Sequence, residues 1–223
     1  MFRLAAGKII SIGIVIAVLG VGAATLLTNS SADDKSDKSG DAVIIEATDH
    51  FLGDRSAPVK IVEYAEVECP YCKKLQPILL RILSEYNGKV SFVYRHFPLT
   101  IHPKSFTEAT ALECVAEDGG DEKFFRYLDK LYAASPSNNN IDLAILPRIA
   151  EEMGIQEETF SKCLASDRYR ARILRDVETG IGLNVDSVPH LIVVAPDGKE
   201  FVFSKSPSYA ALRAVIETAF GEK

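Results

Sequence analysis

Two kinds of hydrophobic pattern alternate along this chain, and together they predict its strands and helices. Residues 59–65 are mostly apolar and β-branched, which predicts a central strand. Residues 69–86 repeat apolar side chains at helical spacing along one face, which predicts a helix that Pro77 should kink. Residues 90–95 again have the composition of a strand. The three elements predict a β-α-β unit, whose crossover connection should be right-handed.

The remainder of the pattern predicts a helical block followed by a second strand-forming part. A short strand is also expected before the β-α-β unit, at 43–46. Helical periodicity extends from about 103 to 184, and Gly and Pro residues divide it into segments. The five helices expected in this block span 104–117, 121–134, 142–153, 156–164 and 168–181. The elements expected after it are two strands and a helix, at 191–195, 200–203 and 209–220. The predicted fold class is therefore α/β, in the order β-α-β, helical block, β-β-α.

The first part of the chain differs from the rest and predicts export. Residues 1–8 include two basic residues and no acid, and residues 9–27 contain no charged side chain. An uncharged run of this length is long enough to cross a lipid bilayer as a helix. Because basic residues precede this run and acids follow it, the positive-inside rule predicts that residues 1–8 are cytoplasmic. The remainder is expected on the extracytoplasmic side, periplasmic or extracellular.

Two interpretations of residues 9–27 are open. One is an uncleaved signal anchor, which would make the protein a single-pass protein of the cell membrane. The other is a cleaved signal peptide, with Ser30-Ser31-Ala32 as an imperfect small-residue cleavage site. In both cases residues 28–41, which are rich in Ser, Asp, Lys and Gly, predict a disordered linker. The folded domain is therefore expected at 42–223.

Composition and charge limit the possible partners without naming a function. The 223 residues are enough for one well-packed domain plus appendages. The net charge of −6 gives no reason to expect a nucleic-acid partner. Four cysteines are too few for a small disulfide-rich scaffold. The cysteines are therefore candidates for individual roles.

A Cys-Pro-Tyr-Cys motif stands where the strand 59–65 gives way to the helix 69–86. Thiolate is the reactive form of cysteine, and the unpaired N–H groups and dipole at a helix start favour it. Cys69 is expected at the first turn with its sulfur exposed, and Cys72, one turn later, should be more buried. Pro70 suits the first turn, where its missing N–H has no partner to lose. We therefore expect Cys69 to be the nucleophile and Cys72 to resolve the mixed disulfide.

Two plainer interpretations compete with a redox site. The pair could lie on the surface without a role, or it could form half of a zinc site. Zinc needs four ligands, and the sequence has no second CxxC and no HxxxH motif. His50, His96 and His102 also lack the spacing of a metal-ligand set. We therefore expect no metal site and no dissociable cofactor, because the electrons of disulfide exchange reside in the two sulfurs.

Four features occur together in this chain. They are Cys-Pro-Tyr-Cys after a strand, Pro77 five residues beyond the second cysteine, a helical insertion, and Val188-Pro189 ahead of a hairpin. Jointly they resemble the DsbA-like thioredoxin-fold proteins, and most of all the membrane-anchored bacterial branch. The resemblance covers about 42 to 220. It implies a thioredoxin-like fold of β-α-β and β-β-α halves, with a helical subdomain inserted at about 103–184.

The resemblance also implies roles for residues around the two cysteines. Pro189 matches the cis-proline that faces the pair in such proteins, and Val188 would offer backbone hydrogen bonds to an extended substrate. Glu63, six residues before Cys69, matches a buried acid that could exchange a proton with Cys72. A solvent-facing acid is the alternative, because the phase of the strand is uncertain by one residue.

Two departures from the family pattern affect the chemistry. His190 follows the proline, where a small, apolar or aromatic residue is expected. A protonated imidazole near Cys69 would favour the thiolate, and a structural histidine at a strand start is the alternative. Pro70 and Tyr71 stand between the cysteines, where the strongest oxidases of the family have Pro-His. The direction of electron flow is therefore open.

Cys114 and Cys163 lie on apolar segments of the helical block. In an exported protein they are expected to form a structural disulfide. It would close a loop of about 50 residues and stabilise the fold by roughly 3–4 kcal/mol. Two buried free thiols, or a second redox-active pair, are the alternatives.

The sequence as a whole favours an extracytoplasmic thiol:disulfide oxidoreductase, most of all an oxidase. Its expected substrates are exported polypeptides, which it would join through a Cys69 mixed disulfide. A membrane or extracytoplasmic redox partner would restore the cysteine pair. One alternative is a disulfide isomerase or reductase that uses the same pair. The other is a non-catalytic thioredoxin-fold module that binds a metal or a protein.

Overall fold

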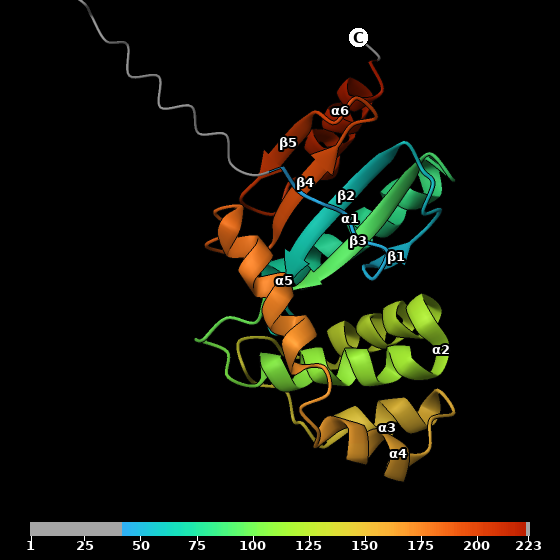
Figure 1. The fold of residues 1–223 in the computed structure, drawn as a ribbon, viewed down its shortest axis with the longest axis vertical. Coiled ribbons are helices and arrows are strands. Elements are labelled where there is room, and N and C mark those ends of the chain that lie inside the picture. The colour runs from blue at the N-terminus through green and yellow to red at the C-terminus, as the bar shows by residue number, and fades with distance from the viewer. Residues whose placement is uncertain (1–41, 222–223) are drawn as a thin grey trace, which may run out of the picture. The chain divides into compact units, whose positions relative to one another are not determined.

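The computed structural model describes residues 42–221, which are built around a five-stranded sheet (Figure 1). The strands are β1 (His50–Leu52), β2 (Val59–Ala65), β3 (Val90–His96), β4 (His190–Val194) and β5 (Glu200–Phe203). Their order in the sheet is β1-β3-β2-β4-β5. Strands β2 and β3 are parallel, and the other neighbouring pairs are antiparallel. The β-α-β unit and the hairpin predicted from the sequence are both present.

Six helices accompany the sheet within the described residues. They are α1 (Pro70–Glu85), α2 (Ser105–Ala134), α3 (Ile145–Glu152), α4 (Glu157–Leu164), α5 (Arg170–Gly182) and α6 (Tyr209–Ala219). Helices α1 and α6 cover one face of the sheet, and α5 packs against the other. Helices α2, α3 and α4 pack on one another as the inserted helical block (Figure 1). The predicted α/β class is confirmed.

Alternation along β2 divides the core into two clusters. Ile61 and Ala65 belong to the cluster under α1 and α6. Val62 and Tyr64 belong to the cluster on the other face, where α5 packs. Successive strand residues point to opposite faces, so Glu63 shares the face of Ile61 and Ala65. The acid therefore lies on the same side of the sheet as α1.

The first part of the helical block contains the break that the sequence predicts. The sequence predicts separate helices at 104–117 and 121–134, and α2 consists of two helical segments that meet at a kink. Gly119 and Gly120 have non-helical torsions at this kink, with φ values of −155° and 60°. Glycine adopts such torsions at little steric cost. The predicted break at Gly119-Gly120 is therefore confirmed.

The strand predicted at 43–46 is wrong, and β1, which the pattern did not reveal, forms the edge of the sheet instead. The backbone of this segment bonds to side chains. The N–H of Val43 donates to Glu200 Oε1 at 2.7 Å, and the N–H of Glu46 donates to Asp49 Oδ2 at 2.7 Å. Such side-chain partners compete with strand pairing. Glu200 is distant in sequence and Asp49 lies just beyond the segment, so the short apolar run itself could not indicate either partner.

Three predicted segments, at 1–8, 9–27 and 28–41, lie outside the described residues. They are the cytoplasmic start, the anchor or signal peptide, and the linker. Within residues 42–221, no helix combines the length and the apolar character needed to cross a membrane. The assignments of the three segments stay predictions.

Gly180 of α5 is the position where we expect a small substitution to damage this packing. A Cβ at this position would lie 2.8 Å from Phe97 Cε2 and 3.0 Å from Tyr64 Cδ1. Both rings are buried in the cluster under α5, where side chains have little room to move. We expect Gly180→Ala to lower the free energy of unfolding by about 1–3 kcal/mol.

Gly182, at the end of the same helix, provides the matched control. No atom lies within 4 Å of the position its Cβ would take. Gly182→Ala should therefore leave the free energy of unfolding within about 0.5 kcal/mol of the parent, or raise it. Denaturant titration of both variants measures the difference. Equal stability of the two variants would show that the rings of Phe97 and Tyr64 can relax.

Candidate active site

The two cysteines of the motif lie at the start of α1. Cys69 is the N-cap residue, with extended torsions of φ −78° and ψ 117°, and Pro70 begins the helix. The sulfur of Cys69 accepts a hydrogen bond from the N–H of Cys72 at 3.4 Å, as a capping side chain does. Both thiols are free in this structure. The start of the helix thus directs a backbone donor at the sulfur of Cys69.

The pKa values of the two thiols are shifted in opposite directions. Hydrogen bonding from the Cys72 side chain lowers the pKa of Cys69 to about 7 against the opposing effect of burial, and the N–H groups of Cys72 and Tyr71 add to this. Burial raises the pKa of Cys72 well above its usual range, and its hydrogen bond to Cys69 and the charge of Glu63 raise it further. Near neutral pH the thiolate therefore forms on Cys69, as a nucleophile requires.

Cys69 is less exposed than the sequence predicts. Only 4% of its surface is accessible, compared with 1% for Cys72. Its thiol donates to the carbonyl oxygen of Val188 at 3.4 Å. The prediction of an exposed sulfur is wrong because the segment ahead of β4 lies against it. That segment is distant in sequence, and the helix pattern carries no information about it.

Val188 and Pro189 form this covering segment, and a pocket opens beside them. The peptide bond between the two residues is cis. The pocket has a volume of about 450 Å³, and Tyr71 and Lys205 also line it. The Tyr71 side chain belongs to the cysteine motif and is 59% exposed. An extended peptide lying in this pocket would pass between Tyr71 and Val188, next to Cys69.

Glu63 is buried on the face of the sheet that α1 covers. It lies opposite Tyr94 of β3 and Leu191 of β4, and its Oε1 has no hydrogen-bond partner among the described residues. Burial raises the pKa of Glu63 well above its usual range, and the nearby charge of Cys69 adds to this. Of the two alternatives left by the sequence, the structure contains the buried acid. Burial therefore favours the protonated, neutral form of this acid.

Two buried tyrosines near this acid are absent from the site predicted from the sequence. The hydroxyls of Tyr94 and Tyr132 have no hydrogen-bond partner among the described residues. Burial raises the pKa of both well above the usual range, and the charges of Cys72 and Glu63 add to this. Tyr94 could have been found by pairing β2 with its parallel neighbour, because it falls opposite Glu63. Tyr132 comes from α2, and no local pattern indicates it.

His190 does not have the surroundings that would make it a cation beside Cys69. It pairs with Tyr64 across the sheet, which places it on the face opposite to that of Glu63. Burial lowers the pKa of His190, so the neutral imidazole is favoured. The geometry therefore favours the structural histidine, which was the alternative left by the sequence.

Cys114 of α2 and Cys163 of α4 are joined by a disulfide, with their Cα atoms 5.9 Å apart. The bond links two helices of the inserted block. Both residues are buried, and they are separate from the free pair at the start of α1.

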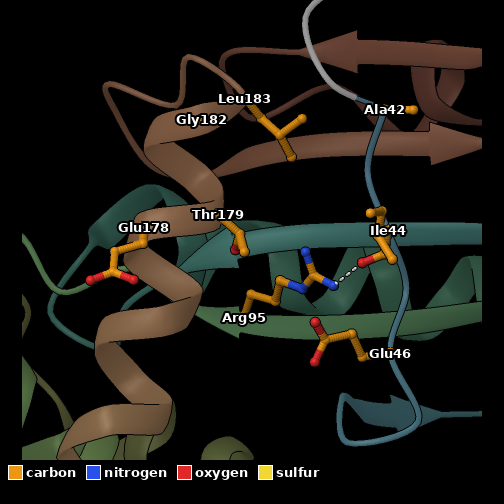
Figure 2. A pocket seen from close by; sticks show the side chains of 8 residues that line it. All are labelled: Ala42, Ile44, Glu46, Arg95, Glu178, Thr179, Gly182 and Leu183. Carbon is orange, nitrogen blue, oxygen red and sulfur yellow. Dashed lines mark hydrogen bonds between the residues drawn. The ribbon is translucent and has the colours of Figure 1, made fainter.

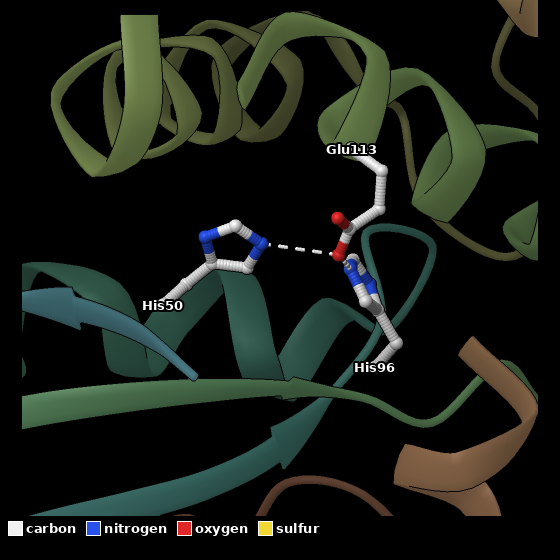
Figure 3. Close-up of side chains that lie close together, drawn as sticks. All are labelled: His50, His96 and Glu113. Atoms are coloured by element: carbon white, nitrogen blue, oxygen red, sulfur yellow. Dashed lines mark hydrogen bonds and ion pairs between the residues drawn. The ribbon is translucent and has the colours of Figure 1, made fainter. Parts of the chain in front are cut away.

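A cluster of two histidines and one glutamate is the arrangement closest to a metal site in the described residues (Figure 3). No metal-ligand spacing is visible in the sequence, because His50, His96 and Glu113 come from three distant elements. Glu113 Oε1 accepts from His50 Nε2 at 3.0 Å and from His96 Nε2 at 2.9 Å. The same oxygen accepts from Arg172 Nε at 2.6 Å. A guanidinium already balances this carboxylate and would repel a metal cation, so we assign the cluster to the scaffold.

A second pocket lies on the face of the sheet away from the cysteines (Figure 2). It has a volume of about 370 Å³ and is lined by Ile44, Arg95 and Thr179 among others. The guanidinium of Arg95 is fully engaged, because it pairs with Asp49 at 2.8 Å and donates to Tyr64 Oη at 2.9 Å. Arg95 is therefore committed to the scaffold.

Comparisons with known proteins agree with this geometry. A family model described as Thioredoxin matches residues 46–218. The chain belongs to the thioredoxin family. A relative named "Probable disulfide bond formation protein D", from Bacillus anthracis, is 28% identical over 193 residues, which cover 83% of this chain and 88% of that protein. The crystal structure of alpha-DsbA1 from Wolbachia pipientis aligns with a TM-score of 0.70 at 22% identity, covering 82% of this chain and 96% of that one. The predicted DsbA-like thioredoxin fold is confirmed.

Another relative is a much longer protein. The Na(+)/H(+) antiporter NhaA 3 of Salinispora tropica is 37% identical over 146 residues, which cover 65% of this chain and 21% of the antiporter. This chain thus spans about a fifth of the length of that relative. The membrane-anchored branch of the DsbA-like proteins stays a prediction for this chain.

The lowered pKa of Cys69 depends first on Cys72, and this can be measured. The pKa should be about 7 in the reduced parent protein. In the Cys72→Ala variant we expect it to rise toward the value of an ordinary cysteine, about 8.5, because the side-chain donor is lost. The rate of iodoacetamide alkylation as a function of pH gives both values. An unchanged pKa in the variant would assign the shift to the helix start alone.

The buried Glu63 should make stability depend on pH. In the unfolded chain Glu63 ionises near its usual pKa, whereas the folded chain keeps the proton to higher pH. Between these values the folded state binds more protons, so the free energy of unfolding falls as pH rises, by up to about 1.4 kcal/mol per pH unit. Glu63→Gln removes this contribution. The free energy of unfolding of the Glu63→Gln variant, minus that of the parent, should therefore increase between pH 5 and 6.5. If this difference is the same at both pH values, Glu63 is ionised in the folded protein.

Proposed function

We propose that this protein is a thiol:disulfide oxidoreductase that acts on exported polypeptides through a mixed disulfide at Cys69. The observation that carries the proposal is the opposite pKa shift of two thiols at one helix start. The pKa of Cys69 is lowered to about 7, whereas the pKa of Cys72 is raised well above its usual range. Such asymmetry separates an attacking sulfur from a resolving sulfur.

The exchange, written in the oxidising direction, begins with a disulfide between Cys69 and Cys72. A substrate thiolate attacks the sulfur of Cys69, so a mixed disulfide forms and Cys72 leaves with the electron pair. Because its pKa is raised, Cys72 takes up a proton, and the neutral carboxyl of Glu63 can supply it. A second substrate thiolate then attacks the substrate sulfur and releases Cys69 as the thiolate. The substrate loses two electrons, and the cysteine pair gains them.

The substrate in this proposal is an extended segment of polypeptide. It would lie in the pocket beside Val188 and Pro189, where the backbone of Val188 can form hydrogen bonds with it. The exposed ring of Tyr71 would cover one side of the segment. These contacts recognise main chain and a generic side chain, so they suit a range of exported proteins.

The proposed place of action is the extracytoplasmic side of the cell membrane, periplasmic or extracellular. Residues 9–27 support a tether or a signal peptide, because they are uncharged and follow basic residues. The bond between Cys114 and Cys163 suits an oxidising compartment. The name of the Bacillus anthracis relative refers to disulfide bond formation. A redox partner in or near the membrane would return the cysteine pair to its starting state.

The reverse direction of electron flow is a second candidate, and the pKa of Cys69 favours it. A strong oxidase stabilises its thiolate to a pKa of roughly 3.5, whereas the reductase thioredoxin has a value of roughly 7. The value for Cys69 is about 7. Measurement of the reduction potential separates the two directions, because an oxidase lies near roughly −120 mV and a reductase near roughly −270 mV.

Turnover by paired cysteine variants tests the function itself. We expect Cys69→Ser to abolish catalysis of both insulin reduction and oxidative refolding. Cys72→Ser should instead accumulate a mixed disulfide between Cys69 and the substrate, because the resolving thiol is missing. Mass spectrometry under non-reducing conditions detects this species. A parent protein that binds a stoichiometric metal and shows no turnover would favour a non-catalytic binding module.

A further inference from the structure

Glu68 ties the residue before the nucleophile to a loop of the helical block. Its side chain accepts hydrogen bonds from the N–H groups of Ile141 at 3.0 Å and Asn140 at 3.3 Å. Its backbone carbonyl accepts from the N–H of Asn138 at 2.8 Å. Glu68 thus bonds to the loop through both main chain and side chain. Because it directly precedes Cys69, the loop and the start of α1 are held together.

Glu108, in the first turn of α2, lies within hydrogen-bonding reach of the Glu68 side chain. Both Glu68 and Glu108 are 0% exposed. Two carboxylates have no proton to donate to each other, and neither oxygen of Glu108 has any other hydrogen-bond partner among the described residues. A proton on Glu108 supplies the missing donor. Burial next to a second carboxyl group favours this protonated form of Glu108.

The loop has a backbone conformation that needs such support. Three successive non-glycine residues are left-handed, with φ values of 65° at Ser137, 56° at Asn138 and 62° at Asn139. This conformation is unfavourable for residues with a side chain and persists where surrounding contacts enforce it. The loop is also tied to the other side of the cysteine pair, because Lys73 Nζ donates to the carbonyl oxygen of Ser135 at 2.7 Å.

We propose that Glu68 and Glu108 are positioning residues for thiol–disulfide exchange: the carboxyl group of Glu108 donates a hydrogen bond to that of Glu68, and Glu68 holds residues 138–141 against the start of α1 and so fixes the position of Cys69. The inference rests on the proposed function, because it concerns the same nucleophile. Neither residue touches the reacting sulfurs in this account. They act through the backbone that carries Cys69.

The charges around the pair agree with a proton held on Glu108. Burial raises the pKa of Glu108 to about 9, and the charge of Glu68, a hydrogen bond with it, and the charge of Glu66 add to this. Lys104 opposes the shift, and Tyr127 of α2 lies near enough to feel the charge of Glu108, although its hydroxyl donates to the carbonyl oxygen of Leu146 at 2.8 Å. Above this pKa two carboxylates would stand side by side and repel each other. The loop should then come away from Glu68.

Hydrogen exchange of the full-length protein in detergent tests the clamp directly. Glu108→Gln keeps a donor for Glu68 without an ionisable group, whereas Glu108→Leu has no donor. At pH 7 we expect the protection factors of the Asn138, Asn140 and Ile141 amides to stay within about twofold of the parent in the Gln variant. In the Leu variant they should fall about tenfold, because Glu68 is left short of a hydrogen bond.

The alkylation rate of Cys69 connects the clamp to the nucleophile. In the Leu variant we expect a changed pH profile and mixed-disulfide formation about tenfold slower, since small displacements of a reacting group are costly. In the Gln variant we expect the pH profile of alkylation and the rate of mixed-disulfide formation to match those of the parent. The parent alone should lose protection of the loop amides as the pH rises through 9, while the Gln variant keeps it. This comparison remains decisive if the Leu variant does not fold.

Failure of the clamp and failure of the proposed function give different results. An active enzyme whose loop amides are equally protected in all three proteins, at pH 7 and above 9, overturns the clamp. Loop protection that follows the predicted order in a protein without any thiol exchange supports the clamp but overturns the proposed function. A Gln variant as poorly protected as the Leu variant would also overturn the hydrogen bond from Glu108 to Glu68.

Discussion

The thiolate of Cys69 at the start of α1 is the group on which the rest of the site depends. Its sulfur receives the N–H of Cys72, and hydrogen bonding from the Cys72 side chain does most to lower its pKa. The two thiols are therefore one coupled system, in which the charge of one requires the proton of the other. The buried Glu63 is part of the same coupled system. A negative charge on Glu63 would oppose formation of the thiolate on the nearby cysteines. Burial favours the protonated form of Glu63, which limits the negative charge beside the Cys69 thiolate.

The central strand separates Glu63 from one buried ion pair of the scaffold. Glu63 points toward α1, whereas Tyr64 and its partner His190 point to the other face. On that other face Arg95 and Asp49 form a buried ion pair. The alternation of side chains along β2 thus places Glu63 and the Arg95–Asp49 pair on opposite faces of the sheet. A shift of register by one residue would exchange the two environments and remove the site.

Local patterns predicted the elements of this fold well and the contacts between distant segments poorly. Residues 59–65, the helix after Cys69 and the final hairpin all follow from periodicity, because each element buries one consistent face. The strand predicted at 43–46 is wrong because side chains from elsewhere satisfy its backbone. The pairing of Glu68 with Glu108 could not be read from the sequence either. It depends on how the helical block meets the sheet, and no spacing rule describes that contact.

The distribution of buried polar groups without partners is itself informative. Protein interiors generally satisfy such groups, so each exception lowers stability. Among the described residues, seven side chains have such groups, and three of them are Ser91, Arg172 and His190. Of the other four, Glu63, Tyr94 and Tyr132 gather near the cysteine pair, and Glu108 lies beside the residue that precedes it. A sequence selected for stability alone would replace these four side chains with apolar ones. Their presence together with a strained loop indicates that this side of the molecule is arranged for the chemistry of Cys69, while the sheet and the covalently linked helical block supply the stability that permits it.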